Sequence, residues 1–214
     1  MEIDKLAQQY LELVLGGRRQ LASALILAAV EEGTPVRAVY LDVFQPVLRE
    51  VGRLWEANVI SIAQEHLATA VTQLVMSQLY PRVFSSDRRD LAMVATCLGG
   101  ELHEIGVRMV ADFFEMGGWD TYYLGANTPD PAVLSELARV KASLLGISVT
   151  ISAHLGRAAT LIQRVRQEPG LGRVKVLVGG LPFLAEPELY RELGADGTAL
   201  DAQAAVARGE ELVR

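Results

Sequence analysis

The stretch LAMVATCLGGELHEIG, residues 91–106, carries the pattern on which the fold prediction rests. Residues 91–96 have the length and apolar content of a buried strand, and residues 107–116 have the pattern of a helix. His103 is therefore expected in a loop at the carboxyl end of a strand. In open parallel α/β sheets, ligands bind at this edge.

His103 stands in a pattern that suits metal ligation. Glu101 lies two positions before it and Gly106 three positions after it. One ring nitrogen of a histidine can bind a metal while a carboxylate holds the other ring N–H, and a glycine lets the backbone pass close to a bulky group. A loop histidine with only a local hydrogen bond is the competing interpretation of so short a pattern.

Length and composition indicate a chain that buries a sizeable core. It has 214 residues, 50% of them hydrophobic, and its formal net charge of −6 argues against a general nucleic-acid-binding surface. No helix-turn-helix pattern is visible, so we expect no direct DNA binding. The longest apolar run, residues 21–30, is about half as long as a membrane span. The acidic start and the single cysteine, Cys97, favour a soluble cytoplasmic protein without membrane attachment.

Residues 1–82 predict a four-helix bundle. Apolar residues recur at helical spacing, and Gly16-Gly17, Gly33 and Asn58 mark the breaks between helices. The four predicted helices cover residues 3–14, 18–32, 36–53 and 60–80.

Three residues of the bundle are candidates for a binding site. Trp55 is expected to close the third helix, and Glu65 and His66 to lie just over one turn into the fourth. An aromatic ring and an acid–imidazole pair would then meet at one end of the bundle. The alternative is that Trp55 anchors the core and that Glu65 and His66 form a solvated face.

The polar residues 84–90 predict a linker, and residues 90–214 predict a second domain in which strands and helices alternate. This order predicts a Rossmann-like (flavodoxin-like) sheet of five parallel strands. The predicted strands cover residues 91–96, 119–124, 144–150, 174–178 and 196–199. The predicted helices cover residues 107–116, 130–141, 154–167, 186–193 and 202–213.

Small and hydroxyl residues end three of the predicted strands. Gly125 follows the second strand, Ser148 and Thr150 end the third, and Gly179-Gly180 ends the fourth. Glycines let an extended ligand lie against the backbone, and hydroxyls bond its polar groups. The loop after the first strand matches neither the Walker nor the dinucleotide spacing, so a metal-bearing cofactor fits it better than a nucleotide.

Glu101-x-His103-x-x-Gly106, Ser148-x-Thr150 and Gly179-Gly180 together resemble the signature of cobalamin-binding domains. The resemblance implies that His103 is the lower axial ligand of the cobalt, in place of the cofactor's dimethylbenzimidazole. It implies that the displaced tail lies in a channel lined by the serine and the glycine pair. The bundle would be the cap over the upper corrin face.

Trp55, nine intervening residues and Glu65-His66 resemble the pattern of light-sensing cobalamin proteins of the CarH and LitR type. The resemblance implies that these side chains pack around the adenosyl group of adenosylcobalamin, that light breaks the cobalt–carbon bond, and that the bundle then moves. We therefore predict a light-responsive sensor rather than an enzyme. It would act through a homodimer or homotetramer interface or through an output protein that the sequence does not identify.

Three features depart from that pattern or extend it. The light sensors carry a MerR-type helix-turn-helix domain, which is not found in this sequence. They also have a second histidine ligand at the position that Glu56 occupies here, and His66 is the candidate to replace that ligand. His154 is expected to be an exposed first-turn residue, or to meet a second chromophore or the bundle. Photocobilins, which hold a linear tetrapyrrole beside cobalamin, are similar in outline. A bilin such as biliverdin would then bind noncovalently, since Cys97 is expected to be buried or next to the corrin.

Two other functions stay open. The chain resembles corrinoid proteins that carry a methyl group for a cobalamin-dependent methyltransferase, although these are not expected to have the Glu65-His66 pair. It could also be a corrinoid-binding antirepressor of a separate transcription factor. Preference for methylcobalamin or adenosylcobalamin would separate the methyl carrier from the sensor.

Overall fold

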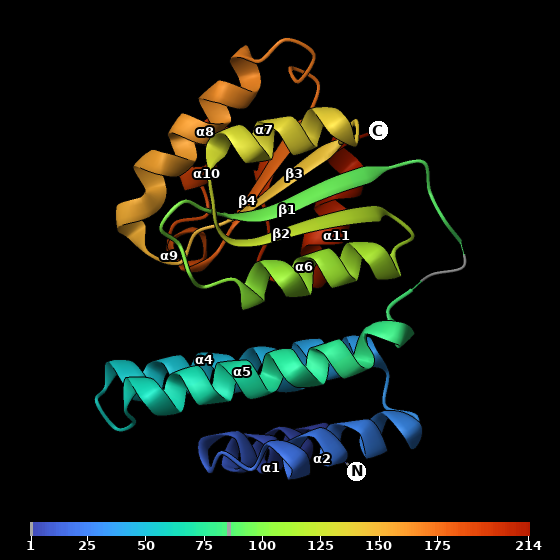
Figure 1. Ribbon diagram of the computed structural model, residues 1–214, viewed down its shortest axis with the longest axis vertical. Coiled ribbons are helices and arrows are strands. Elements are labelled where there is room, and N and C mark those ends of the chain that lie inside the picture. Colours follow the sequence, from blue (N-terminus) through green and yellow to red (C-terminus); the bar gives the residue numbers. More distant parts are fainter. Residues whose placement is uncertain (1, 85–86) are drawn as a thin grey trace. The chain divides into compact units, whose positions relative to one another are not determined.

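The computed structural model describes residues 2–84 and 87–214, so Met1 and the predicted linker residues Ser85 and Ser86 lie outside the described residues. The chain divides into two compact units, Met1–Val83, which is helical, and Phe84–Arg214, which holds a sheet (Figure 1). None of the described helices is long and apolar enough to cross a membrane.

The first unit consists of helices that pack around one core. Its elements are α1 (Ile3–Leu15), α2 (Arg19–Glu31), α3 (Val36–Ala38), the π-helix η1 (Val39–Phe44), α4 (Gln45–Glu56), α5 (Ile62–Leu79) and the 3-10 helix η2 (Tyr80–Arg82). Tyr10, Tyr40 and Phe44 are fully buried, and the Tyr10 hydroxyl donates a hydrogen bond to Thr72 Oγ1 at 3.1 Å. Burial of these aromatic rings supplies much of the driving force for the unit.

The third predicted helix, residues 36–53, is continuous but changes its hydrogen-bond pattern at η1. Pro46 follows η1 at the start of α4 and has no N–H to donate to the carbonyl four residues earlier. A π-helical turn accommodates this loss without breaking the helix. α5 begins with a capping box, in which Ser61 Oγ accepts from Gln64 N and Gln64 Oε1 accepts from Ser61 N.

The second unit holds a parallel sheet in the order β2-β1-β3-β4-β5, which confirms the predicted fold class. The strands are β1 (Ala92–Leu98), β2 (Asp120–Thr128), β3 (Leu144–Ser148), β4 (Lys175–Gly179) and β5 (Gly197–Thr198). The helical elements are α6 (Ile105–Met116), α7 (Asp130–Arg139), η3 (Ser152–His154), α8 (Leu155–Gln167), α9 (Leu181–Ala185), α10 (Leu189–Glu192) and α11 (Ala202–Leu212).

Two hydrophobic layers cover the two faces of the sheet. Val94 and Leu145 point to one face, where they pack with buried residues of α7 and α8. Met93 and Leu144 point to the other face, where they pack with α6 and α11. Figure 1 shows the two pairs of helices on opposite sides of the strands. Because β1, β3 and β4 carry buried residues on both faces, the ends of these strands and the loops that follow them are the parts best placed to bind a ligand.

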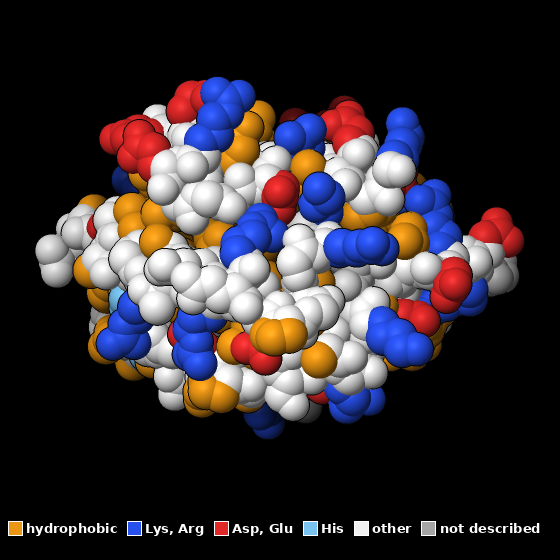
Figure 2. All heavy atoms as spheres, turned by 90° about the horizontal axis from the view of Figure 1, so that it is seen from above, with side chains coloured by type: hydrophobic (Ala, Val, Ile, Leu, Met, Phe, Trp, Pro, Cys, Tyr) orange, Lys and Arg blue, Asp and Glu red, His pale blue; other side chains and the backbone are white. Residues whose placement is uncertain are grey.

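The outer surface over α7 and α8 shows no continuous hydrophobic area in Figure 2. Lys and Arg side chains alternate there with Asp and Glu, and hydrophobic side chains occur in small groups. Arg139 pairs with Glu136 at 2.5 Å and Arg164 with Asp130 at 3.0 Å. A surface that mixes charged side chains of both signs with small hydrophobic groups is typical of helices that face solvent.

The predicted helix over residues 186–193 is confirmed only for Leu189–Glu192, which form α10. A separate short helix, α9, ends at Ala185, and Glu186 after it has a φ of −131° and a ψ of 84°, which are not helical. Pro187 explains the break, because the ring of a proline disfavours helical geometry at the residue before it.

Candidate functional site

The candidate site lies at the carboxyl ends of the three central strands. Cys97 of β1 pairs with Ser148 of β3, and Ser148 pairs with Gly179 of β4. The loops that follow these residues therefore start side by side. They carry His103, Thr150 and Gly180, which the sequence predicts as site residues.

Glu101 is the buried centre of these loops, with no exposed side-chain surface. Its Oε1 accepts from the ring Nδ1 of His103 at 2.5 Å and from the backbone N–H of His103 at 3.2 Å. Its Oε2 accepts from the backbone N–H of Thr150 at 3.0 Å and of Ile151 at 3.2 Å, and from Nδ1 of His154 at 3.0 Å. One carboxylate thus ties the loop after β1 to the loop after β3.

The protonation of Glu101 fixes the state of the two imidazoles. Burial raises the pKa of the Glu101 carboxyl, but hydrogen bonds from His103, His154 and the loop backbone outweigh burial and hold its pKa at about 2. An ionised carboxylate only accepts hydrogen bonds, so both Nδ1 atoms carry a proton. With its proton on Nδ1, the ring of His103 presents Nε2 as the atom that can bind a metal, and its side chain is 49% exposed. This arrangement suits a metal ligand.

The described residues do not supply a complete metal site. Among residues 2–84 and 87–214, no group of three His, Cys, Asp or Glu side chains is placed to hold a metal ion. A metal bound to His103 would have to arrive with most of its ligands, as cobalt does in a corrin ring. The donor set therefore fits a corrinoid better than a free metal ion.

The glycines of the site fall into two classes. Gly180 has a φ of +111°, and an added Cβ would lie 1.9 Å from the carbonyl oxygen of Val149, so the fold itself requires a glycine there. Gly106 and Gly179 have no such φ, and an added Cβ would meet nothing within 4 Å. The protein's own packing does not need glycine at these two positions, so they leave free backbone surface for a ligand.

A second set of contacts holds the loop after β2 beside the same edge. Glu104 Oε2 accepts from the backbone N–H of Ala126 at 2.8 Å, and Asn127 Oδ1 accepts from the backbone N–H of Gly100 at 2.7 Å. Asn127 itself has a left-handed φ of 52°, which asparagine tolerates. Arg157 of α8 donates to the carbonyl oxygen of Gly99 at 2.5 Å.

Cys97 is a structural residue at this edge. Burial raises the pKa of its thiol to about 12, and the nearby charges of Glu101 and Glu104 act in the same direction. Its Sγ lies 3.5 Å from the carbonyl oxygen of His103. A buried neutral thiol is a weak ligand and a weak nucleophile.

Trp55, Glu65 and His66 lie in the helical unit. Trp55 is in the last turn of α4 and is 41% exposed, whereas Glu65 and His66 are in the first turns of α5. His66 Nδ1 contacts Glu65 Oε2 at 2.5 Å, and Thr69 donates to Glu65 Oε1 at 2.9 Å. The link between the two helices has the predicted left-handed Asn58, with a φ of 56°.

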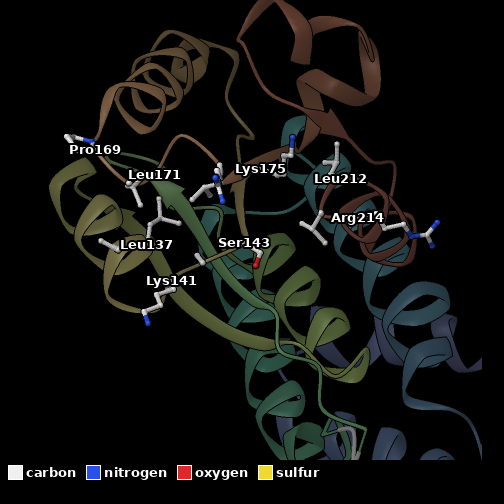
Figure 3. A pocket seen from close by; sticks show the side chains of 14 residues that line it. Leu137, Lys141, Ser143, Pro169, Leu171, Lys175, Leu212 and Arg214 are labelled. Atoms are coloured by element: carbon white, nitrogen blue, oxygen red, sulfur yellow. The ribbon is translucent and has the colours of Figure 1, made fainter.

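A cavity of about 610 Å³ lies at the opposite edge of the sheet. Figure 3 shows Ser143 and Lys175, at the amino ends of β3 and β4, with Leu137 and Leu171 beside them. None of the residues at the His103 edge lines this cavity. It is therefore separate from the candidate site.

His154 is the site residue that sequence reasoning assigned to a different role. It was expected to be exposed or to meet a second chromophore, but it is 17% exposed and bonded to Glu101, 53 positions earlier. The only signal in the sequence is its position just after the third strand, at the same sheet edge as His103.

Comparisons with known proteins describe what the chain resembles. A family model described as "B12 binding domain" matches residues 91–207, and a second of the same description matches residues 6–80. The dimethylamine corrinoid protein of Methanosarcina barkeri is 24% identical over 216 residues, covering 100% of both chains.

Two solved structures share the fold. The monomethylamine corrinoid protein of Methanosarcina barkeri has a TM-score of 0.86 at 22% identity and covers 97% of this chain and 98% of its own. The methanol:cobalamin methyltransferase complex of the same organism has a TM-score of 0.52 at 15% identity, over 98% of this chain and 80% of its own.

The prediction of a photoreceptor of the CarH and LitR type is wrong, because the relatives are methylamine corrinoid proteins. That prediction rested on the spacing of Trp55, Glu65 and His66. In the structure Glu65 bonds to His66 and Thr69, and a helix surface makes such contacts without any ligand. The spacing of three residues over two helices therefore does not specify a light-sensitive adenosyl group.

Proposed function

The chain belongs to the B12 binding domain family, and on that premise we propose that it is a corrinoid protein that carries a methyl group for a cobalamin-dependent methyltransferase. The observation that carries the proposal is the similarity to a dimethylamine corrinoid protein over the full length of both chains. The chain would supply no catalytic group of its own. Its contribution is to hold the cofactor and to present it to partner enzymes.

His103 would hold the cobalt through Nε2 from the lower side. Glu101 supports this role because it fixes the proton on Nδ1 and so leaves Nε2 free. When bound, the corrinoid supplies a cobalt centre that accepts and donates a methyl group. The protein residues bind and orient that centre, and the methyl donor and acceptor belong to other proteins.

The remaining predicted site residues would contact the rest of the cofactor. Gly106 and Gly179 leave room for it, and Gly180 and Ser148 lie beside Gly179 at the ends of β4 and β3. Thr150 already gives its backbone N–H to Glu101, so its side chain is the part available to a ligand. We propose contact with the corrinoid for Trp55, Glu65 and His66 as well, without any light-dependent step.

The partners follow from the same similarity. One would be a methyltransferase that demethylates a methylated amine, and a second would pass the methyl group to an acceptor. A homo-oligomer stays a prediction. Methylcobalamin is the expected loaded form, with adenosylcobalamin and a noncovalent bilin as the alternatives to be tested.

The experiment compares the two cobalamins in darkness. The apo protein is mixed with methylcobalamin or adenosylcobalamin, and absorption spectra follow binding and replacement of the lower ligand. We expect methylcobalamin to bind with a histidine ligand that is lost in His103→Ala and kept in the control Arg173→Ala, which lies at the opposite edge of the sheet. A methylated-amine methyltransferase should then demethylate its substrate only when the wild-type protein is present. Exclusive binding of adenosylcobalamin, or transfer without His103, would refute the proposal.

A further inference from the structure

A cavity at the amino ends of β3 and β4 has no part in the proposed function. The volume of this amino-edge cavity, about 610 Å³, is in the range of pockets that hold small organic ligands. The structure describes all of its lining residues, and none of them is Asp or Glu, whereas four are cationic: Lys141, Arg173, Lys175 and Arg214. In a chain with a formal net charge of −6, they form a local region of opposite sign.

These four cations have no ion-pair partner among the described residues. The acidic side chains close to them in the sequence do not neutralise them. Glu136 pairs with Arg139 at 2.5 Å, and Glu211 pairs with Arg208 at 3.0 Å. Glu168, at the end of α8, does not line the cavity. An anionic ligand would therefore not have to break an existing ion pair.

The ends of three helices give a competing reason for cations at this edge. α7, α8 and α11 all end beside the amino-edge cavity, and the carboxyl end of a helix carries roughly half a negative charge. Three such ends offset about 1.5 positive charges. Lys141, Arg173 and Lys175 therefore leave a surplus of about 1.5 charges even when Arg214, the last residue of the sequence, is not counted.

Lys141 has a backbone conformation that does not favour a lysine. It follows the end of α7 with a φ of 51°, in the left-handed region where glycine or asparagine is usual after a helix. A glycine at this position would end the helix with less strain. Local folding therefore does not explain the lysine, whereas a ligand for its ammonium group would.

Ser143 and Lys175 form the fixed part of the cavity, because both belong to the hydrogen-bonded edge of the sheet. The backbone N–H of Lys175 donates to the carbonyl oxygen of Ser143 at 3.0 Å. Leu137 and Leu171 supply apolar surface beside them (Figure 3). The Ser143 hydroxyl and the Lys175 ammonium can donate hydrogen bonds to an anionic group while the leucines contact an apolar part of the same ligand. This combination fits an organic anion better than a bare ion.

We propose that the amino-edge cavity binds an organic phosphate through Lys141 and Lys175, with Arg173 adding to the positive charge. A phosphoryl group carries about two negative charges at neutral pH, so it offsets the surplus of positive charge better than a single carboxylate does. Its organic part lies against the leucines. The inference goes beyond the proposed function and does not depend on it, since the cavity is separate from the edge that carries His103.

Titration calorimetry tests the ligand class, with adenosine diphosphate and citrate as the probes. The full chain is first loaded with methylcobalamin, so that neither probe can enter the proposed cofactor site. We expect one site for adenosine diphosphate and weaker binding of citrate, which carries several carboxylates and no phosphate. Citrate binding as tight as that of adenosine diphosphate would overturn the assignment to phosphates, and no binding of either probe would overturn the site.

Two lysine variants and a control test the residues. Lys141→Asn keeps a residue that tolerates the left-handed conformation, and Lys175→Met keeps most of the aliphatic stem. Each should weaken binding of adenosine diphosphate about tenfold, because each removes one charged donor. Lys141→Asn should not lower the Tm of the unloaded chain. The control Arg139→Gln removes a cation from the same helix end but not from the cavity, so the affinity should stay within about twofold of the wild type.

Three outcomes would overturn the inference. Unchanged affinity in both lysine variants would remove the site. An equal loss in Arg139→Gln would show only a general attraction of anions. A lower Tm in Lys141→Asn with unchanged affinity would show that this lysine stabilises the helix end instead. Failure of the wild-type chain to bind a cobalamin would refute the proposed function, and the same titrations on the unloaded chain and its Lys175→Met variant would still decide the inference.

Discussion

Gly180→Ala and Gly179→Ala are adjacent substitutions for which the structure predicts opposite consequences. At Gly180 the φ of +111° and ψ of 180° lie in a region that only glycine adopts freely. The new Cβ would lie 1.9 Å from Val149 O and 2.7 Å from Val149 C. Both atoms belong to the backbone, so no rotamer change relieves the contact.

The cost of Gly180→Ala has two sources. The backbone conformation costs a non-glycine residue about 1–3 kcal/mol. Moving the turn away from Val149 strains the neighbouring hydrogen bond from Val149 N to Gly179 O, now 2.9 Å, which is worth about 1 kcal/mol. We therefore expect the free energy of unfolding of the sheet unit to fall by about 3 kcal/mol, which corresponds to about 10 °C in Tm.

Gly179→Ala should leave the apo protein unchanged within about 0.5 kcal/mol, because the added Cβ meets nothing within 4 Å. If the cofactor lies against this surface, the methyl side chain of the new alanine must displace the cofactor. Overpacking of about 1–3 kcal/mol would weaken cobalamin binding by about 5-fold to 150-fold.

The assay must report on the sheet unit alone. The chain has two tryptophans, and Trp119 lies in the second unit, where it is fully buried against Phe114. In a Trp55→Phe background, Trp119 fluorescence during urea unfolding therefore follows that unit. Equal stability losses in the two glycine variants, or none in Gly180→Ala, would refute the steric reasoning. Unchanged cobalamin affinity in Gly179→Ala would show that the cofactor does not use this surface.

Three further substitutions test other contacts of the second unit. Gly106→Ala should stabilise α6 by up to about 0.8 kcal/mol, measured by thermal unfolding, and should weaken cobalamin binding. A gain in both stability and cobalamin affinity would contradict a ligand at that surface. Glu104→Gln keeps an acceptor for Ala126 N but removes the negative charge that strengthens the bond, so it should cost about 1 kcal/mol of stability in urea, and an unchanged urea midpoint would show that the charge does not contribute. Arg88→Met should remove the cation that lies 2.6 Å from the buried Glu115 and leave this carboxylate only its bonds from Thr121, at a cost of about 1 kcal/mol, so an unchanged urea midpoint would rule out a stabilising pair.

The sequence by itself determined most of the elements and the sheet edge at which His103 lies. Residues 91–96 are apolar because β1 is covered on both faces, and the alternation of strands and helices requires a parallel sheet. Local signals such as Asn58 at a turn and Gly33 at a helix end act over a few residues, so they can be recognised in a single sequence. The same locality made the spacing of Trp55, Glu65 and His66 misleading about function.

Only the tertiary structure decided which groups meet at the site. The bond between His154 and Glu101 and the close approach of Gly180 to Val149 depend on the register of β1, β3 and β4. Register is set by packing across the whole sheet, and no pattern near either residue encodes it. The sequence therefore predicts a histidine at a ligand-binding edge. The fold alone determines the buried carboxylate shared by His103 and His154.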